Sequence, residues 1–319
     1  MSKTNSLGVR KAGLPPLFLH ALFLLVALLV HGTAAFGQAT RPGTRGSHSS
    51  RPRPTLSADE RDMIDRAIEV VCKERKRDPQ GSIPIDDMQG RPSLPVQSVE
   101  AVEGAARAQR LLPVAQLLTV DALRRVASEY NFQRSSAGSL RLERAILRVQ
   151  NVMRVKPDVD SRDNASVFLR NPKTITFGTI FLAGLKSDEA MISVLAHELS
   201  HIADGDRASL RILFRAVGER ASALTGLTIY DQQAEELTCD YVGALAARSF
   251  VADSPAYDPL ARRIARAVEH NCVNDDEGDE DHLSPRNTIR AILALNPTLT
   301  WELVYDREDQ IRPRPARGN

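Results

Sequence analysis

The chain has 319 residues, enough for one large domain or for one domain with an appendage. Its hydrophobic content of 42% and its charged content of 26% are ordinary for a soluble globular protein. Frequent arginines are balanced by acids, which leaves a formal net charge of +2. We therefore expect no nucleic-acid partner, since such proteins carry a strong basic excess.

The first 39 residues have the layout of a secretory signal peptide. Basic residues precede a short apolar run, residues 17–30, and a stretch of small residues ends at Ala39. The run is shorter than the roughly 20 residues of a membrane span, so we expect cleavage and a periplasmic or extracellular protein. An uncleaved N-terminal anchor is the alternative. Residues 40–56 predict a disordered basic linker, compatible with proximity to an anionic membrane surface.

Residues 57–137 predict a helical preface to the catalytic part. Ser57 and Glu60 form a capping-box pattern at the start of a helix that ends near Lys76. Two further helices are expected, over residues 99–110 and over residues 120–130 with Thr119 as N-cap. No residue here indicates chemistry, so the preface could shape a substrate groove or simply cover the core.

Residues 138–300 are expected to form the catalytic domain. It begins with an amphipathic helix whose apolar face comprises Leu140, Leu142, Ile146, Leu147, Val149 and Val152. Residues 164–169 and 174–182 then predict two strands joined by a turn at residues 170–173. An edge strand beside a metal-binding helix can pair with an extended peptide, although a purely structural hairpin fits the pattern equally well.

The next predicted helix, residues 187–204, carries the pattern His-Glu-x-x-His at His197, Glu198 and His201. Histidines four apart lie on one helix face, so both imidazoles can bind one zinc ion beside Glu198 as a base. By chance the pattern would occur in roughly one chain of this size in a hundred. Because unpaired charges are costly in so apolar a helix, we favour a metal site over a structural histidine pair.

A catalytic zinc ion needs a third protein ligand and one open position. In the predicted helix over residues 231–249, Glu236 and Asp240 share a face. Glu236 could therefore bind the metal, and Asp240 could accept a hydrogen bond from a ligand histidine. Glu235 is expected to be an exposed acid, and Cys239 is a conceivable soft ligand that lies off this face.

Other features complete the chain. In an exported protein a disulfide is permitted, and we prefer Cys72 with Cys272, although three buried free thiols are nearly as compatible. Further segments are expected after the metal helix: helices over residues 207–224, 259–268 and 284–295, an acidic loop over residues 273–281, and a C-terminal tail over residues 301–319.

The strand pair, the His-Glu-x-x-His helix and the Glu-x-x-x-Asp pattern resemble peptidase family M48, which includes CAAX prenyl proteases, HtpX proteins and soluble periplasmic peptidases. The resemblance covers residues 140–295. It implies an α+β, mostly helical, zincin-like (gluzincin) fold with a small β-sheet beside the zinc helix. It also implies one Zn²⁺ per chain and these roles: His197, His201 and Glu236 on zinc, Glu198 as general base, and Asp240 supporting a ligand.

Two departures from that family matter. Its members often carry a His-Pro step before an arginine near the end of the domain, whereas here His282 is separated from Pro285, and Arg290 follows. His282 or Arg290 is the expected oxyanion donor, with Arg290 the firmer position. No spanning segment is expected after residue 30, which indicates the soluble, exported branch.

The sequence therefore predicts a zinc-dependent metalloendopeptidase that hydrolyses exported or envelope proteins, with unfolded polypeptides as partners. The alternative is an envelope quality-control or assembly factor that binds unfolded proteins, with latent or rare proteolysis. A structural zinc protein is a weaker third possibility, because structural sites are usually closed by four protein ligands.

Overall fold

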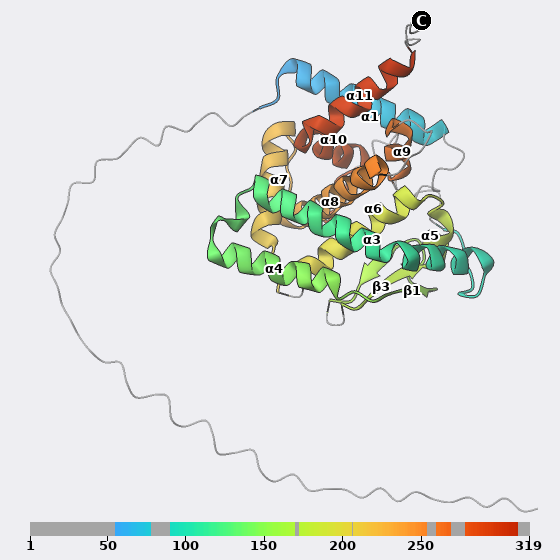
Figure 1. Ribbon diagram of the computed structural model, residues 1–319. Helices are drawn as coiled ribbons and strands as arrows, with labels where there is room; N and C mark the ends of the chain where they lie inside the picture. The colour runs from blue at the N-terminus through green and yellow to red at the C-terminus, as the bar shows by residue number, and fades with distance from the viewer. Residues whose placement is uncertain are drawn as a thin grey trace, which may run out of the picture. The chain divides into compact units, whose positions relative to one another are not determined.

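The computed structural model describes residues 55–77, 90–169, 172–205, 207–253, 260–268 and 278–311. Most of these residues are helical and one three-stranded sheet lies at one end of the molecule, so the expected mostly helical α+β class is confirmed (Figure 1). The signal peptide, most of the basic linker, Cys272 and most of the acidic loop lie outside these residues. Within the described part of the chain, no helix is both long and apolar enough to cross a membrane.

Helix α1 (Ala58–Arg77) begins where the capping box predicted. The Ser57 backbone N–H donates to the Glu60 carboxylate at 2.7 Å, and the Ser57 hydroxyl accepts from the Glu60 N–H at 3.2 Å. These reciprocal bonds satisfy two groups that a helix start leaves unpaired, and they fix the first turn.

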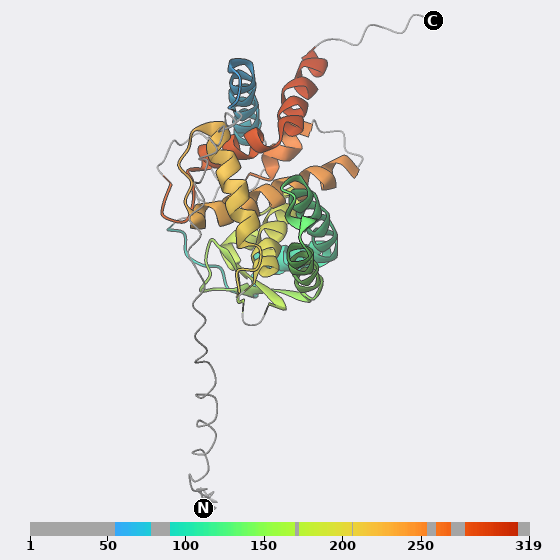
Figure 2. The same cartoon turned by 90° about the vertical axis from the view of Figure 1, so that its left-hand side faces the viewer.

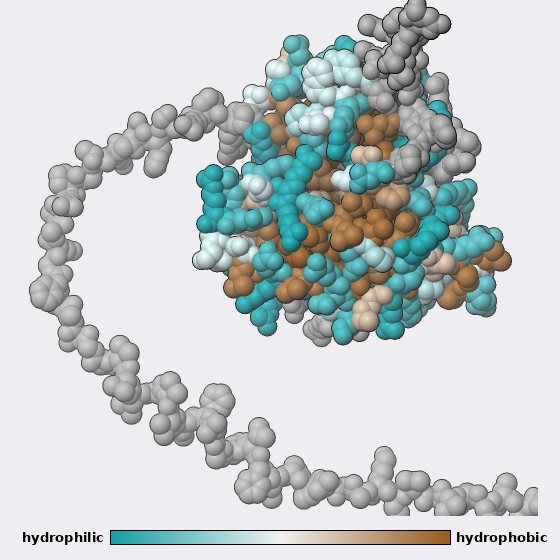
Figure 3. Space-filling model, in the orientation of Figure 1, coloured by the Kyte–Doolittle hydropathy of each residue, from teal (hydrophilic) through white to brown (hydrophobic). Residues whose placement is uncertain are grey.

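Helix α3 (Val99–Glu129) is one continuous helix of 31 residues, so the prediction of two helices was wrong. Thr119 is no N-cap: it is fully buried, and its hydroxyl donates to the Ala115 carbonyl at 2.7 Å. One face of α3 packs against helices described below, and this burial outweighs the local cost of Pro113. Val99 and Leu117 of α3 remain exposed. Figure 3 shows that apolar residues also gather on one face of the molecule.

A short 3₁₀ turn, η1 (Phe132–Arg134), leads into α4 (Ser136–Gln150). The prediction of the apolar face of α4 was only partly correct, because Leu140 and Leu147 are more than half exposed. Both point away from the core that Leu142 and its helical neighbours enter.

The sheet has the strand order β1-β3-β2. The predicted hairpin is confirmed as antiparallel β2 (Ala165–Val167) and β3 (Thr174–Gly178), while β1 (Arg154–Asp158), which pairs parallel with β3, was missed. The second strand was predicted too long: it ends at Gly178, and α5 (Thr179–Gly184) follows. A Cβ at Gly178 would lie 1.8 Å from the Arg162 carbonyl oxygen, so glycine is needed at this change of direction.

The remaining helices follow in the order α6 (Asp188–Asp204), α7 (Arg211–Thr225), α8 (Asp231–Asp253), α9 (Leu260–Arg266), α10 (Pro285–Leu295) and α11 (Pro297–Ile311). The larger hydrophobic cluster joins α6 to α3, α4, α8 and the sheet. A second cluster joins α1 to α9, α10 and α11, at the end of the molecule opposite the sheet (Figures 1 and 2).

The C-terminal tail expected over residues 301–319 is helical as far as Ile311, because α11 includes these residues. Leu299 and Leu303 are buried in the second cluster, so the chain stays helical to Ile311. The preface and the catalytic segment share one core, because α3 packs against α6 and α8. Cys72 of α1 is disulfide-bonded, in agreement with an oxidised pair, whereas Cys239 is a buried free thiol.

Candidate metal centre

Helix α6 carries the His-Glu-x-x-His pattern and is fixed at both ends. At its start, the Ser187 hydroxyl accepts from the Ala190 N–H at 3.1 Å. At its end, the Arg148 guanidinium of α4 donates to the carbonyls of Ile202 and Asp204, each at 3.2 Å. A cation at the C-terminal carbonyls also complements the helix dipole. The ligand-bearing turn of α6 is thereby held in position.

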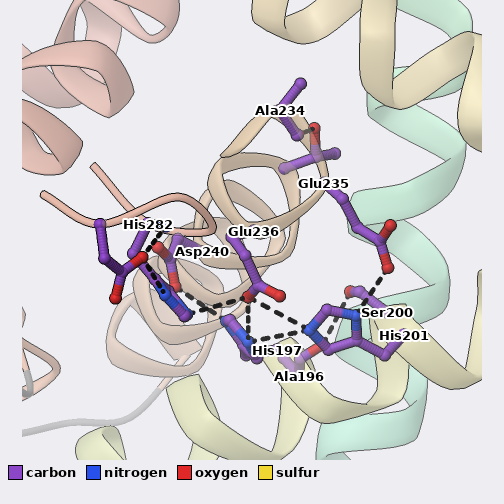
Figure 4. A network of polar contacts seen from close by, with 11 residues as sticks. Ala196, His197, Ser200, His201, Ala234, Glu235, Glu236, Asp240 and His282 are labelled. Carbon is purple, nitrogen blue, oxygen red and sulfur yellow. Dashed lines mark hydrogen bonds and ion pairs between the residues drawn. The ribbon is translucent and has the colours of Figure 1, made fainter. Parts of the chain in front are cut away.

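Three side chains converge between α6 and α8, as Figure 4 shows. The Nε2 atoms of His197 and His201 are 3.1 Å apart, and each lies 3.3 Å from Oε2 of Glu236. Zinc bonds of about 2.0–2.1 Å in tetrahedral directions would separate their ligand atoms by about 3.3 Å. The donor set and its spacing therefore fit a single metal ion, with His197, His201 and Glu236 as ligands.

A second row of carboxylates on α8 orients the two imidazoles. Nδ1 of His197 lies 2.8 Å from Oδ1 of Asp240, and Nδ1 of His201 lies 3.1 Å from Oε1 of Glu235 (Figure 4). Because a carboxylate accepts, each Nδ1 carries the hydrogen and each Nε2 is left to the metal. The role expected for Asp240 agrees with this geometry. Glu235, expected to be a plain exposed acid, is instead the partner of His201.

The electrostatics of the metal-free centre favour protonated imidazoles. Burial lowers the pKa of His197, but the contacts with Asp240 and Glu236 outweigh it and raise this pKa well above its usual value. Burial also lowers the pKa of His201, but Cys239 and the nearby carboxylates raise it overall. Burial raises the pKa of Glu236, yet hydrogen bonds from both histidines bring it below its usual range. An arriving metal ion must therefore displace protons from this centre.

Glu198 lies beside the ligands without belonging to the converging group. Its side chain is buried, with 6% of the residue exposed, and burial raises its pKa. It lines the same cavity as His197 and Asp240. A buried carboxylate whose proton affinity is raised in this way is suited to take up and release a proton during a reaction.

His282 and Arg290 have different positions. His282 precedes α10, and its Nε2 lies 3.6 Å from Oε2 of Glu236, so it reaches the metal centre (Figure 4). Arg290 of α10 instead forms an ion pair with Asp65 of α1 at 3.6 Å and donates to Asn287 at 3.2 Å. Of the two residues, the structure therefore places His282 beside Glu236, whereas the contacts of Arg290 are with Asp65 and Asn287.

A cavity of about 590 Å³ opens beside the centre. His197, Glu198 and Asp240 line it on one side, and Ala165 of the edge strand β2 lines it on another. Strand β2, which is one of the two edges of the sheet, therefore adjoins α6, as the sequence suggested.

Comparisons with protein-family models, with curated proteins and with solved structures found no match to the chain. The functional assignment therefore depends on the chemistry of the centre.

Proposed function

We propose that the protein is a zinc-dependent metalloendopeptidase of the gluzincin type. The observation that carries the proposal is the convergence of two imidazole nitrogens and one carboxylate oxygen beside a buried glutamate. Three protein ligands leave one position of a tetrahedral ion open, which is typical of catalytic rather than structural zinc. The resemblance to peptidase family M48 supports the same reading.

Zinc is the metal that suits this set of donors best, because nitrogen and oxygen ligands at tetrahedral spacing are characteristic of it. When bound, it would polarise the scissile carbonyl and lower the pKa of a water molecule. The side chains do the remaining chemistry. Glu198 takes the proton of the attacking water and passes it to the leaving amine. Asp240 and Glu235 accept hydrogen bonds from the two ligand imidazoles and thereby fix the orientation of the rings.

Two further parts act on the substrate. His282 donates to the oxyanion that develops on the scissile carbonyl, since its Nε2 lies within 3.6 Å of the ligand Glu236. Strand β2 binds the substrate as an added strand, because it is the edge strand whose Ala165 lines the cavity. Strand addition requires an extended chain, which favours unfolded exported or envelope proteins as substrates.

The test compares metal content and casein cleavage for residues 40–319 and three variants. Wild type is expected to bind one zinc ion and to cleave. Glu198→Gln should keep the zinc and lose turnover, whereas Glu236→Ala should lose the zinc as well. Glu219→Gln, an exposed glutamate of α7, is the matched control and should behave as wild type.

The opposite results separate the alternatives. If Glu198→Gln cleaves casein at a near-normal rate, Glu198 is not the base. If Glu198→Gln loses cleavage but keeps the protein's role in the cell, the protein acts as a quality-control or assembly factor. If Glu236→Ala binds zinc as tightly as wild type, the proposed ligand set is wrong.

A further inference from the structure

We propose that the cavity beside the metal centre takes a large apolar side chain of the substrate, next to the bond that is cleaved. This inference rests on the peptidase function proposed above, and it names the class of residue that the site selects. It also gives the second hydrophobic cluster a role in substrate choice.

The lining of the cavity is polar at the metal centre and mostly apolar elsewhere. His197, Glu198 and Asp240 line it at the centre. Most of the remaining lining is apolar and comes from several helices, among them Ala244 and Ala247 of α8, Ile264 of α9, and Ile289 and Ile292 of α10. Its volume of about 590 Å³ lies within the range of sites that hold small ligands. Such a space next to the reacting groups is large enough for a bulky side chain.

The far wall comes from the two ends of the described chain. Val71 of α1 and Leu299 and Leu303 of α11 line the cavity, and all three belong to the second cluster. These helices lie outside the residues that resemble the peptidase family. The layer of α1 and α11 therefore shapes the space that a substrate side chain would enter, in addition to covering the core.

The charges of the lining decide which side chains fit. Among the described lining residues there is no lysine or arginine, and the acids Asp163, Glu198, Asp240 and Asp279 are all present. An acidic side chain would meet these carboxylates and, among the described lining residues, no lysine or arginine. A lysine or arginine would be attracted by the carboxylates but would lose its hydration against the apolar residues that form most of the lining. Large uncharged apolar side chains such as phenylalanine, leucine and methionine avoid both costs.

Small residues of α8 keep the cavity open. A Cβ at Gly243 would lie 2.9 Å from the Ser193 carbonyl oxygen, so glycine allows α8 to approach α6 closely here. Ala244, the next residue, lines the cavity with its single methyl group. Ala244 and Ile289 are both only partly buried, so changes in their size should alter the cavity with little strain elsewhere.

The experiment uses zinc-loaded protein and a set of acetylated octapeptides with one central residue varied among Trp, Phe, Leu, Ala, Asp and Lys. Binding is measured on Glu198→Gln by calorimetry, and cleavage by wild type is followed by mass spectrometry, which locates the cut. Since one methylene in an apolar pocket is worth about 10- to 200-fold, the Phe peptide should exceed the Ala peptide by at least about 100-fold in both assays.

Two variants should move this preference in opposite directions. Ala244→Phe, which fills the cavity, should remove the advantage of the Phe peptide while the Ala peptide is still cleaved. Ile289→Ala, which enlarges it, should extend cleavage to a Trp peptide. Ile212→Ala changes an exposed isoleucine of α7 outside the cavity lining and serves as the matched control.

The two assays separate this inference from the peptidase function. Cleavage without any preference for a large apolar residue would overturn the role of the cavity and leave the peptidase intact. A preference in binding without cleavage by wild type would support the cavity and overturn the peptidase. Neither binding nor cleavage would overturn both.

Discussion

The candidate metal ligands and His282 lie close together but are held in different ways. The three ligands lie on α6 and α8, two helices packed along much of their length, and each imidazole also contacts a carboxylate. His282 lies in the irregular segment before α10 and is exposed. Its backbone N–H and its Nδ1 both contact Asp279, at 2.6 Å and 3.1 Å.

The difference suggests that the α6–α8 pair serves metal binding and that His282 serves turnover. Helix packing fixes the ligand atoms before any substrate is present, which is what metal affinity requires. A residue held by a local turn can adjust when a substrate arrives. We therefore expect changes at the α6–α8 pair to alter metal binding, and changes at His282 to alter turnover with the metal retained.

After that of Glu198→Gln, the largest expected effect on turnover is that of His282→Ala. Loss of one oxyanion donor typically lowers kcat by about 10²–10³. Zinc content should remain at one ion per chain, measured by atomic emission beside steady-state kinetics. An increase in kcat would instead show that the imidazole obstructs the metal, and the role of His282 in turnover would then be wrong.

A smaller effect is expected when the carboxylates behind the ligands are changed. Asp240→Asn should weaken zinc binding by about 10- to 100-fold, the usual range for residues that support a metal ligand. Glu235→Gln should weaken it less, because its contact with His201 is 3.1 Å long, compared with 2.8 Å for Asp240 and His197. Competition with a chromophoric chelator measures both. Equal affinities for wild type and Asp240→Asn would contradict a role for this contact.

The smallest expected effect is a pH dependence of stability from Asp204, at the end of α6. Burial raises the pKa of Asp204 to about 6, although its hydrogen bond from the Leu210 N–H opposes this. The native state then binds the proton more tightly than the unfolded state does. The resulting stabilisation is complete below the usual pKa of about 4 and is lost as the pH rises through about 6.

Urea unfolding of metal-free protein between pH 4 and pH 7 checks the effect of Asp204. Asp204→Asn keeps an oxygen acceptor for the Leu210 N–H and cannot ionise. Its free energy of unfolding should therefore fall less than that of wild type over this range. Parallel curves for the two proteins would show that Asp204 ionises normally in the folded state.

The sequence was most informative where local spacing determines geometry. The positions of His197, His201, Glu236 and Asp240 follow from the four-residue repeat of a helix, and the structure brings all four together. The contact of Glu235 with His201 was not predicted, because only one face of α8 was considered as a source of partners. Two imidazoles one turn apart present Nδ1 in different directions, so two faces of the facing helix can supply acceptors. Three acids in the six residues from Glu235 to Asp240 of a largely buried helix were the available signal.

Contacts between distant segments were harder to predict. Strand β1 has alternating exposed and half-buried residues, including Pro157, and it is defined mainly by its pairing with β3. The expected interruption between residues 110 and 120 was wrong, because α3 continues through them and packs against α6 and α8. Arg290 was placed at the site by resemblance alone, and its actual partner, Asp65, is separated from it by most of the chain.

The packing of α1 against α11 also affects the order in which parts of the chain can fold. During synthesis, α1 leaves the ribosome early, but the residues that complete its hydrophobic cluster are near the other end of the chain. The metal ligands span only residues 197 to 236, so the pair of helices that holds them can form sooner. A newly made molecule could thus assemble the candidate metal centre before α11 completes the hydrophobic cluster that α1 begins.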